Sequence, residues 1–551
     1  MKIKDRTNIN KRYNAMKNEY SSWVPTWRDI ARFVRPGRGF FFEQIPNWGI
    51  ALDHKTMLDS VPVRAIRTMA AGMTSGLTSP SRPWFKLGFE DHELDKFGPV
   101  KEWLEQVQKL MMGVFSKSNI YGAFTTMYEE CGAFGTAAMA LLEDYDNVVR
   151  ARTFTIGEYF LGQGSDGRIN SFGRNFRMTV GQLVEEFGIE NCTESTQNDY
   201  KTKNYDKWVQ VCCLIEPDSE NSGEYGSFVR KPYRSIYWEN GSPDDMCLDN
   251  RGFDDFPILS PRWDTMNTMN IYGKSPGWDS LGDCKMLMKM QNDRLLALDK
   301  VIDPPMQVSG SVQTEVNTMP GGVTRNSAGT PDAGVKPAYQ INPDMGAIER
   351  AILDTRQAIK ETFYNDLFLM LSSIDSPQKT AYEIAKRYEE KLLMLGTVIE
   401  RLESELHDPT IERTFSIMQR AGLIPPPPEE IQGLPMKVDY ISTLAQAQKM
   451  VGTTSIEETL NFVGQVSTIN PSVVDNIDYD DAVREYAEMK GVPPTILRTQ
   501  VELMALRKAK EDQARAQEIA QAMPEMVKGA KTLSETKLEG NSALDAMVGN
   551  R

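Results

Sequence analysis

The stretch Ala347–Gly422 reads AIERAILDTRQAIKETFYNDLFLMLSSIDSPQKTAYEIAKRYEEKLLMLGTVIERLESELHDPTIERTFSIMQRAG, and it decides the fold. Apolar side chains recur in it at spacings of three and four, which places them on one stripe of a helix. One group runs from Ile348 to Leu371 and a second from Ala381 to Leu406. Taken alone, the pattern indicates an interior helical hairpin of a large α-helical protein, because apolar stripes usually belong to a core.

A proline separates the two predicted helices. Pro377 has no amide hydrogen to donate, and it biases Ser376 away from the helical region. The first helix must therefore end before it, and residues 372–378 are predicted to form a loop.

Two further signals follow the second helix. Asp408 can cap a helix and Pro409 suits a first helical position, so the pair predicts that a new helix starts after His407. Gly422, followed by a run of prolines, predicts a firm end to that helix.

Residues 1–270 carry both helical and strand patterns, which indicates a mixed α+β body. The predicted helices before Ala347 are 1–36 in two pieces around Pro25, 61–77, 100–115, 120–142, 179–187 and 279–302. The predicted strands are 84–87, 148–156, 159–161, 175–178, 208–215, 228–237 and 257–262. After Gly422, helices are predicted at 442–451, 455–463, 480–490 and 495–523.

Residues 306–339 differ from their flanks. They are rich in Gly, Pro, Ser, Thr and Asn, with short strand-like pieces near both ends. Composition alone leaves a disordered linker and a small β-rich excursion equally open. The helices predicted on both sides favour the excursion.

The composition limits the function. A formal net charge of -14 argues against a broad basic surface that grips DNA, although it does not exclude a protein that lets DNA pass. The six cysteines include no C-x-x-C pair and the three histidines lie far apart, so we expect reduced thiols, no metal site and no cofactor. The charged N-terminus and the absence of an apolar run of about 18 residues predict a chain made in the cytoplasm without a membrane span.

Motifs of catalysis are absent from the sequence. There is neither a G-x-x-x-x-G-K-[ST] phosphate loop nor a G-x-G-x-x-G turn between a strand and a helix. Adjacent acids such as Glu129–Glu130, Glu185–Glu186 and Asp254–Asp255 do not face each other on a helix, so we interpret them as solvated surface. We therefore expect no catalytic residues and no enzyme activity.

Several separated strings resemble one known family, the portal (head-to-tail connector) proteins of short-tailed, T7-like bacteriophages. The family pattern has an arginine where Lys274 stands. The strings carrying the resemblance are AGMTSGLTSPSRPWF at 71–85, SNIY at 118–121, FGTA at 134–137, PRW at 261–263, YGKSP at 272–276, DPP at 303–305, and TAYEI at 380–384 with Arg387 and Leu395–Gly396. Together these strings, in this order, span most of residues 10–510.

The resemblance implies a mainly helical α+β portal fold assembled as a dodecameric ring around a channel. The implied regions are a wing at 1–278, a first stem helix at 279–305, a clip at 306–345, a second stem helix at 346–371, a channel loop at 372–378, a long wing helix and its successor at 379–440, and a crown with a C-terminal tail at 441–551.

The resemblance also implies a function and partners. The ring would sit at one vertex of the virion capsid, pass and retain double-stranded DNA, nucleate capsid assembly, and dock the terminase large subunit and later the tail adaptor and nozzle proteins. It would also contact the major capsid and scaffolding proteins. The residues implied to contact DNA are Ser372, Ser373, Asp375, Ser376, Gln378 and Lys379 of the channel loop, and those implied to contact terminase or tail adaptor are Val312, Gln313, Glu315 and Arg325 of the clip. The alternative is a virion structural or internal protein, other than a portal, with a helical hairpin core.

Overall fold

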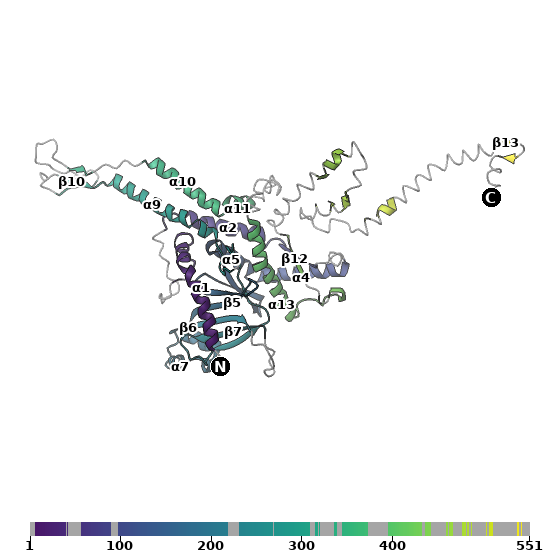
Figure 1. Ribbon diagram of the computed structural model, residues 1–551, viewed down its shortest axis with the longest axis horizontal. Helices are drawn as coiled ribbons and strands as arrows, with labels where there is room; N and C mark the ends of the chain where they lie inside the picture. Colours follow the sequence, from purple (N-terminus) through teal and green to yellow (C-terminus); the bar gives the residue numbers. More distant parts are fainter. Residues whose placement is uncertain are drawn as a thin grey trace. The chain divides into compact units, whose positions relative to one another are not determined.

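The computed structural model describes most of the chain. The described residues are 6–39, 41, 57–89, 97–218, 231–267, 269–308, 315–317, 319, 335–338, 344–372, 395–431, 433, 436–441 and short pieces of 459–542. The chain divides into two compact units, Met1–Val451 and Gly452–Arg551. In the second unit the described pieces include the strand pair β13 (Lys537–Leu538) and β14 (Asn541–Ser542). The first unit contains the helices and sheets in Figure 1, so the predicted α+β class is confirmed.

Four helices build the N-terminal part of the first unit: α1 (Arg6–Phe33), α2 (Val61–Leu77), α4 (Gly98–Lys117) and α5 (Ile120–Phe134). Helix α5 lies deepest, with both ends and its middle buried. Its small residues let α2 approach closely, because a Cβ at Gly132 would lie 1.9 Å from the Met69 methyl carbon.

The sheets are antiparallel throughout their described pairings. The five-stranded sheet has the order β4 (Tyr159–Gln163), β5 (Ile169–Thr179), β6 (Trp208–Pro217), β7 (Tyr233–Glu239) and β8 (Asp249–Phe253). A three-stranded sheet has the order β3 (Val148–Phe154), β2 (Ala138–Asp144) and β9 (Ile258–Leu259). Strand β1 (Phe85–Gly88) pairs with β12 (Lys437–Tyr440), which joins the N-terminal body to the chain after the helical stretch. The short helices α6 (Val180–Phe187) and α7 (Glu194–Lys201) connect β5 to β6.

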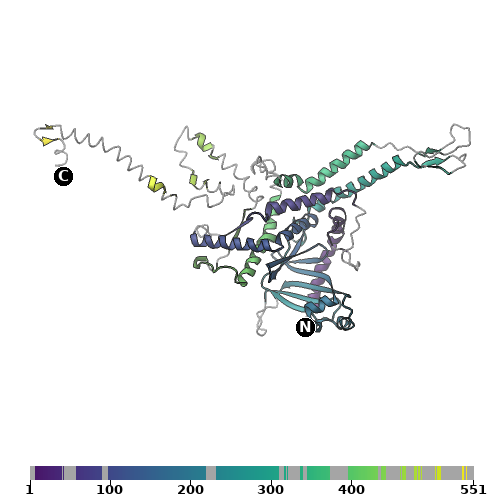
Figure 2. The same cartoon turned by 180° about the vertical axis from the view of Figure 1, so that it is seen from behind.

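A buried carboxylate joins α1 to the five-stranded sheet, across which α1 lies in Figure 1 and, seen from behind, in Figure 2. Glu216 of β6 accepts two hydrogen bonds of 2.7 Å from Arg12 of α1 and a further one of 2.6 Å from Arg234 of β7. Paired guanidinium groups are what a buried carboxylate requires. The N-terminal helix is therefore part of the body.

Two predicted helix boundaries are wrong. Helix α1 runs without interruption through Pro25, where two pieces were expected. The predicted helix 120–142 ends at Phe134, because Gly135 adopts a left-handed φ of 83°. The chain then turns into β2, so residues 138–142 are strand.

A helix does begin after His407, as predicted, but no break in the helical chain precedes it. Glu403–His407 forms a single π-helical turn in which the Asp408 amide donates to the Glu403 carbonyl, and α13 (Asp408–Arg420) continues from it. Pro409 cannot donate a hydrogen bond, and the wider turn accommodates it without a break. The predicted end at Gly422 is confirmed by its φ of 68°.

The π-helical turn places His407 in an aromatic cage. Its Nε2 lies 2.8 Å from the Tyr128 hydroxyl, and its ring contacts those of Trp84, Phe124 and Tyr440. Burial lowers the pKa of His407 to about 3, so the imidazole is neutral in the folded protein at neutral pH.

The interpretation of Glu129–Glu130 as solvated surface is wrong. Both side chains are buried, and Glu129 accepts hydrogen bonds from Arg35 at 2.5 Å and Arg38 at 3.3 Å. Glu130 accepts from Thr155 at 2.9 Å, and its burial raises its pKa to about 7. The pair thus holds the segment that follows α1, through arginines that the helix pattern of α5 does not reveal.

We predict an acid-sensitive contribution of His407 to stability. The folded pKa lies below the ordinary 6.5, so the unfolded chain binds the extra proton and stability falls as the pH drops below about 6.5. Measured by denaturant unfolding, the His407→Gln variant should lose less stability than the wild type on acidification. The difference should be about 1.4 kcal/mol for each pH unit below 6.5. Parallel pH profiles for the two proteins would contradict this.

A second variant checks the sign. The folded pKa of Glu130 is raised from 4.5, so its contribution is largest at low pH and is lost as the pH rises toward about 7. As the pH rises toward about 7, the Glu130→Gln variant should therefore lose less stability than the wild type, whereas His407→Gln differs from the wild type on acidification.

Candidate functional site

A helical arm is the most prominent candidate for a functional element. We call arm the segment formed by α9 (Leu281–Ile302), β10 (Met306–Val308), β11 (Val335–Pro337) and α10 (Met345–Thr362). In Figures 1 and 2 its two helices lie side by side and lead away from the sheets, with the strand pair at the far end. The short helix α8 (Pro276–Asp279), capped by the Ser275 hydroxyl, leads into α9.

Local sequence explains where the arm helices begin and end. Helix α9 ends at Ile302, with Asp303 as its C-cap before two prolines, and Asp344 caps α10 by accepting from the Ala347 amide at 2.9 Å. Strands β10 and β11 pair antiparallel, with Met306 opposite Pro337. A β-rich excursion, rather than an unstructured linker, is therefore confirmed at both ends of 306–339.

Asp59 fixes the base of the arm. One carboxylate oxygen accepts from the Val61 amide at 2.9 Å, in the first turn of α2. The other accepts from Gln291 of α9 at 2.8 Å and from Arg356 of α10 at 2.9 Å. A single side chain, 5% exposed, thus joins three helices.

The hydrogen bonds keep this carboxylate ionised. Burial alone raises the pKa of Asp59, but the donors from Val61, Gln291 and Arg356 lower it by more, and the pKa lies below its ordinary value. Because each partner belongs to a different helix, ionised Asp59 holds the arm at a set angle to α2.

The predicted second helix of this region is interrupted. It was expected to continue to Leu371, but α10 ends at Thr362 and α11 (Asn365–Ser372) begins after a turn in which Tyr364 has a φ of 54°. A left-handed tyrosine costs about 1–3 kcal/mol. The turn brings Phe368 onto α2, where a Cβ at Gly72 would lie 2.4 Å from it, and burial of Phe368 offsets the strain.

Large apolar side chains remain exposed on these helices. They are Leu295, Leu296, Val301 and Ile302 of α9, Leu353 of α10 and Leu369 of α11, with exposed fractions from 45% to 78%. Exposed apolar groups concentrated on one element mark a protein contact. The arm therefore presents surface that a single copy of the chain leaves uncovered in its described part.

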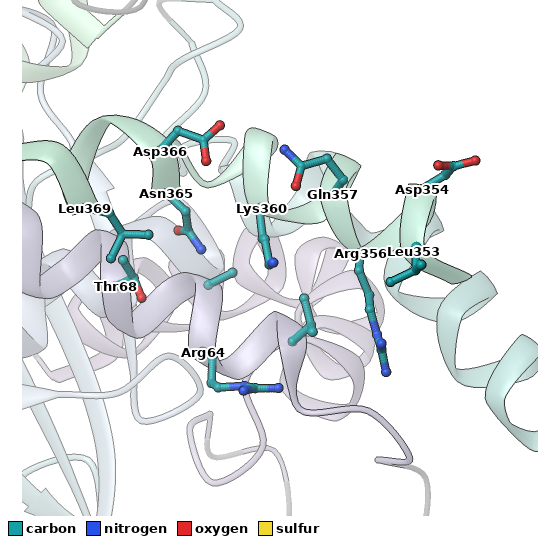
Figure 3. Close-up of a pocket in the computed structure, with 12 residues that line it drawn as sticks. Arg64, Thr68, Leu353, Asp354, Arg356, Gln357, Lys360, Asn365, Asp366 and Leu369 are labelled. Atoms are coloured by element: carbon teal, nitrogen blue, oxygen red, sulfur yellow. The ribbon is translucent and has the colours of Figure 1, made fainter. Parts of the chain in front are cut away.

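A groove of about 700 Å³ lies between α2 and the pair α10–α11. Figure 3 shows Arg64 of α2 on one wall and Lys360 and Arg356 of α10 on the other, all directed into it. Asp354 and Asp366 also line the groove, with their carboxylates turned outward in the same view. The lining thus carries three cations and two carboxylates, and Arg356 is the cation that is paired with Asp59.

Most of the residues predicted to be functional lie outside the described part of the chain. These are Ser373, Asp375, Ser376, Gln378 and Lys379 of the expected channel loop, and Val312, Gln313 and Arg325 of the expected clip. Ser372 is the last residue of α11, and Glu315 is exposed. Their roles stay predictions.

The sequence did not point to Asp59, Arg64, Arg356 or Lys360. Asp59, three residues before Pro62, could have been noted as a helix-start signal, but its partners lie more than 200 positions away. Among the described residues no group of three or more His, Cys, Asp or Glu is placed to hold a metal ion. No described helix is long and apolar enough to span a bilayer.

Known proteins resemble the chain over nearly its whole length. The family model "Bacteriophage head to tail connecting protein" matches residues 6–497. The portal protein of Salmonella phage epsilon15 is 40% identical over 536 residues, covering 97% of this chain and 96% of the relative. The probable portal protein of Bordetella phage BPP-1 is 38% identical over 538 residues, covering 98% and 96%. A solved gene transfer agent neck, at 11% identity and 74% and 88% coverage, has a TM-score of only 0.34, which supports no argument about the fold.

We predict that Asp59→Asn loosens the arm at its base. The change removes the charge that Arg356 requires, and breaking a buried pair costs about 3–5 kcal/mol. Hydrogen exchange of α9 and α10 amides should accelerate more than exchange in the five-stranded sheet. The matched control is Asp354→Asn, an exposed acid on α10 beside Arg356. Equal exchange in both variants would refute the role of Asp59.

Proposed function

The chain belongs to the family of bacteriophage head to tail connecting proteins, and we propose that it forms the portal ring through which a phage capsid takes up and releases double-stranded DNA. The observation that carries this proposal is the match over residues 6–497, together with portal relatives aligned over 96% of their own length. The chain thus acts as a structural protein of the virion, at the capsid vertex where head and tail meet.

The uncovered surface of the arm supports a ring. A chain that meets its neighbours head to tail uses two different patches and closes when the rotation closes. Each arm then lies between two others, and its exposed leucines and Ile302 become interface. We propose a dodecameric ring, with the arms as its stem.

The charge of the chain supports passage of DNA. Each phosphate that a protein neutralises adds a salt-dependent binding contribution, so a channel that must let DNA slide should avoid many such contacts. A chain of net charge -14 meets that requirement. Binding of isolated DNA by the ring is therefore expected to be weak.

We assign the regions as follows. The body at 1–278 is the wing, and the stem consists of 279–305, which contains α9, and the helices at 346–371. Residues 306–345, with Val312, Gln313, Glu315 and Arg325, are the clip that docks the terminase large subunit and then the tail adaptor. Residues 372–378 form the channel loop, 379–440 the long wing helix and its successor, and 441–551 the crown. The major capsid and scaffolding proteins are further partners of the ring. The alternative of an internal virion protein loses its support, because the nearly full-length relatives are portal proteins.

We predict that the purified chain forms closed rings. Negative-stain images should show a central hole, and native mass spectrometry should give twelve times the chain mass of 62.2 kDa. A monomer at every concentration tested would overturn the proposal. A closed ring of another size would correct only the number of subunits.

We predict that residues 372–378 help to retain packaged DNA. Ser372, Ser373, Ser376 and Gln378 can donate weak hydrogen bonds to phosphates, Lys379 adds one charge, and Asp375 limits the attraction. Replacing 372–378 by a Gly-Ser linker of equal length should leave rings intact and reduce the full-length DNA kept by filled heads.

The control for this replacement is the same Gly-Ser exchange in the exposed turn 145–147 between β2 and β3, which should change neither property. Heads that keep their DNA as stably as wild type after the 372–378 exchange would exclude a retention role for the loop.

A further inference from the structure

We propose that the groove between α2 and α10–α11 receives the acidic face of α9 from the neighbouring copy of this chain. Leu296, Asp299 and Asp303 of one copy enter the groove of the next. The inference rests on the proposed ring and identifies the residues by which neighbours meet.

The groove that receives the neighbour contains cations without partners. Within the described part of the chain, the side chains of Arg64 and Lys360 form no hydrogen bond or ion pair. They face the same space from opposite walls, as Figure 3 shows. Two unpaired cations directed into one groove favour an acidic occupant.

The groove also contains an unsatisfied amide. Asn365, 5% exposed, points into it, and its Oδ1 has no hydrogen-bond partner among the described residues. A buried amide oxygen without a donor is costly in an isolated protein. An incoming polar segment can satisfy it.

The rim of the groove is apolar. Leu353 and Leu369 lie on its α10 and α11 sides, 54% and 56% exposed. Leucines around a charged centre favour a protein occupant over a free anion, because covering them excludes water.

The surface that enters the neighbour's groove is one face of α9. Asn292, Leu296, Asp299 and Asp303 follow the spacing of a single helical stripe, and all four are exposed. Neither aspartate has a side-chain partner in the described part of the chain. By the same spacing Lys289 belongs to this stripe, on the body side of Asn292, and Lys300 lies to one side of it.

The two aspartates oppose the stability of their own helix. They lie at the C-terminal end of α9, where the helix dipole favours cations. Local helix stability therefore gives no reason for them. Contact with the groove of a neighbour gives one, because their charges are complementary to Arg64 and Lys360.

The geometry requires inclined arms. Gln291 and Arg356 meet at Asp59 and so lie at the same level of the arm. From that level Lys360 lies toward the body and Asp299 away from it, which separates them along the arm by about 18 Å at 1.5 Å per residue. Neighbours related by rotation can bring them together only if each arm leans toward the next subunit.

A charge exchange tests the contact. The groove variant carries Arg64→Glu and Lys360→Glu, and the helix variant carries Asp299→Lys and Asp303→Lys. Each variant alone sets like charges against each other, so the ring fraction measured by mass photometry should fall by about tenfold or more. An equimolar mixture should restore rings, because alternating copies make every contact complementary again.

The controls separate the possible failures. Lys109→Glu with Lys201→Glu reverses two exposed lysines of the body and should leave the ring fraction unchanged. Rings unaffected by either variant, or losses that the mixture does not rescue, overturn the pairing of these two faces. Wild-type chain that forms no rings overturns the proposed function instead. Circular dichroism of each variant checks the fold, and rescue by mixing shows that both chains were folded.

Discussion

The buried carboxylate of Asp59 holds the first turn of α2, Gln291 of α9 and Arg356 of α10 at one point. Its effect reaches well beyond its own position. The arm helices are long and carry exposed apolar side chains, so packing within one chain does little to direct them along their outer parts. A charged group shared by three helices provides that direction, because a misaligned arm would leave a buried charge unpaired.

The same principle recurs throughout the body. Glu216 joins α1 to the sheet through Arg12 and Arg234, and Glu405 in the π-helical turn accepts from Arg262 at 2.5 Å. In each case a carboxylate and an arginine distant in sequence fix one element against another. These links fix the elements of the body around the arm against one another.

The sequence predicted the elements better than their junctions. Periodicity and capping residues identified α2, α4, α9, α10 and the end of α13, because those signals are local. The continuous helix at Pro25, the turn at Tyr364 and the strand after Gly135 depend on tertiary packing. Asp59 could not be found from one sequence, since Gln291 and Arg356 lie far away in the chain, and the groove cations could not be found because the two walls of the groove are distant in sequence. The family resemblance succeeded because it compares order and spacing over the whole chain.

The central claim is that the arms, set by Asp59, are the elements through which copies of the chain meet. A cryo-electron microscopy reconstruction of the assembled ring tests it most directly. The account predicts neighbouring arms inclined around the channel, with Leu296 and Leu353 buried between subunits. A ring closed by contacts of the body alone, with the arms separate and these leucines exposed to solvent, would contradict it.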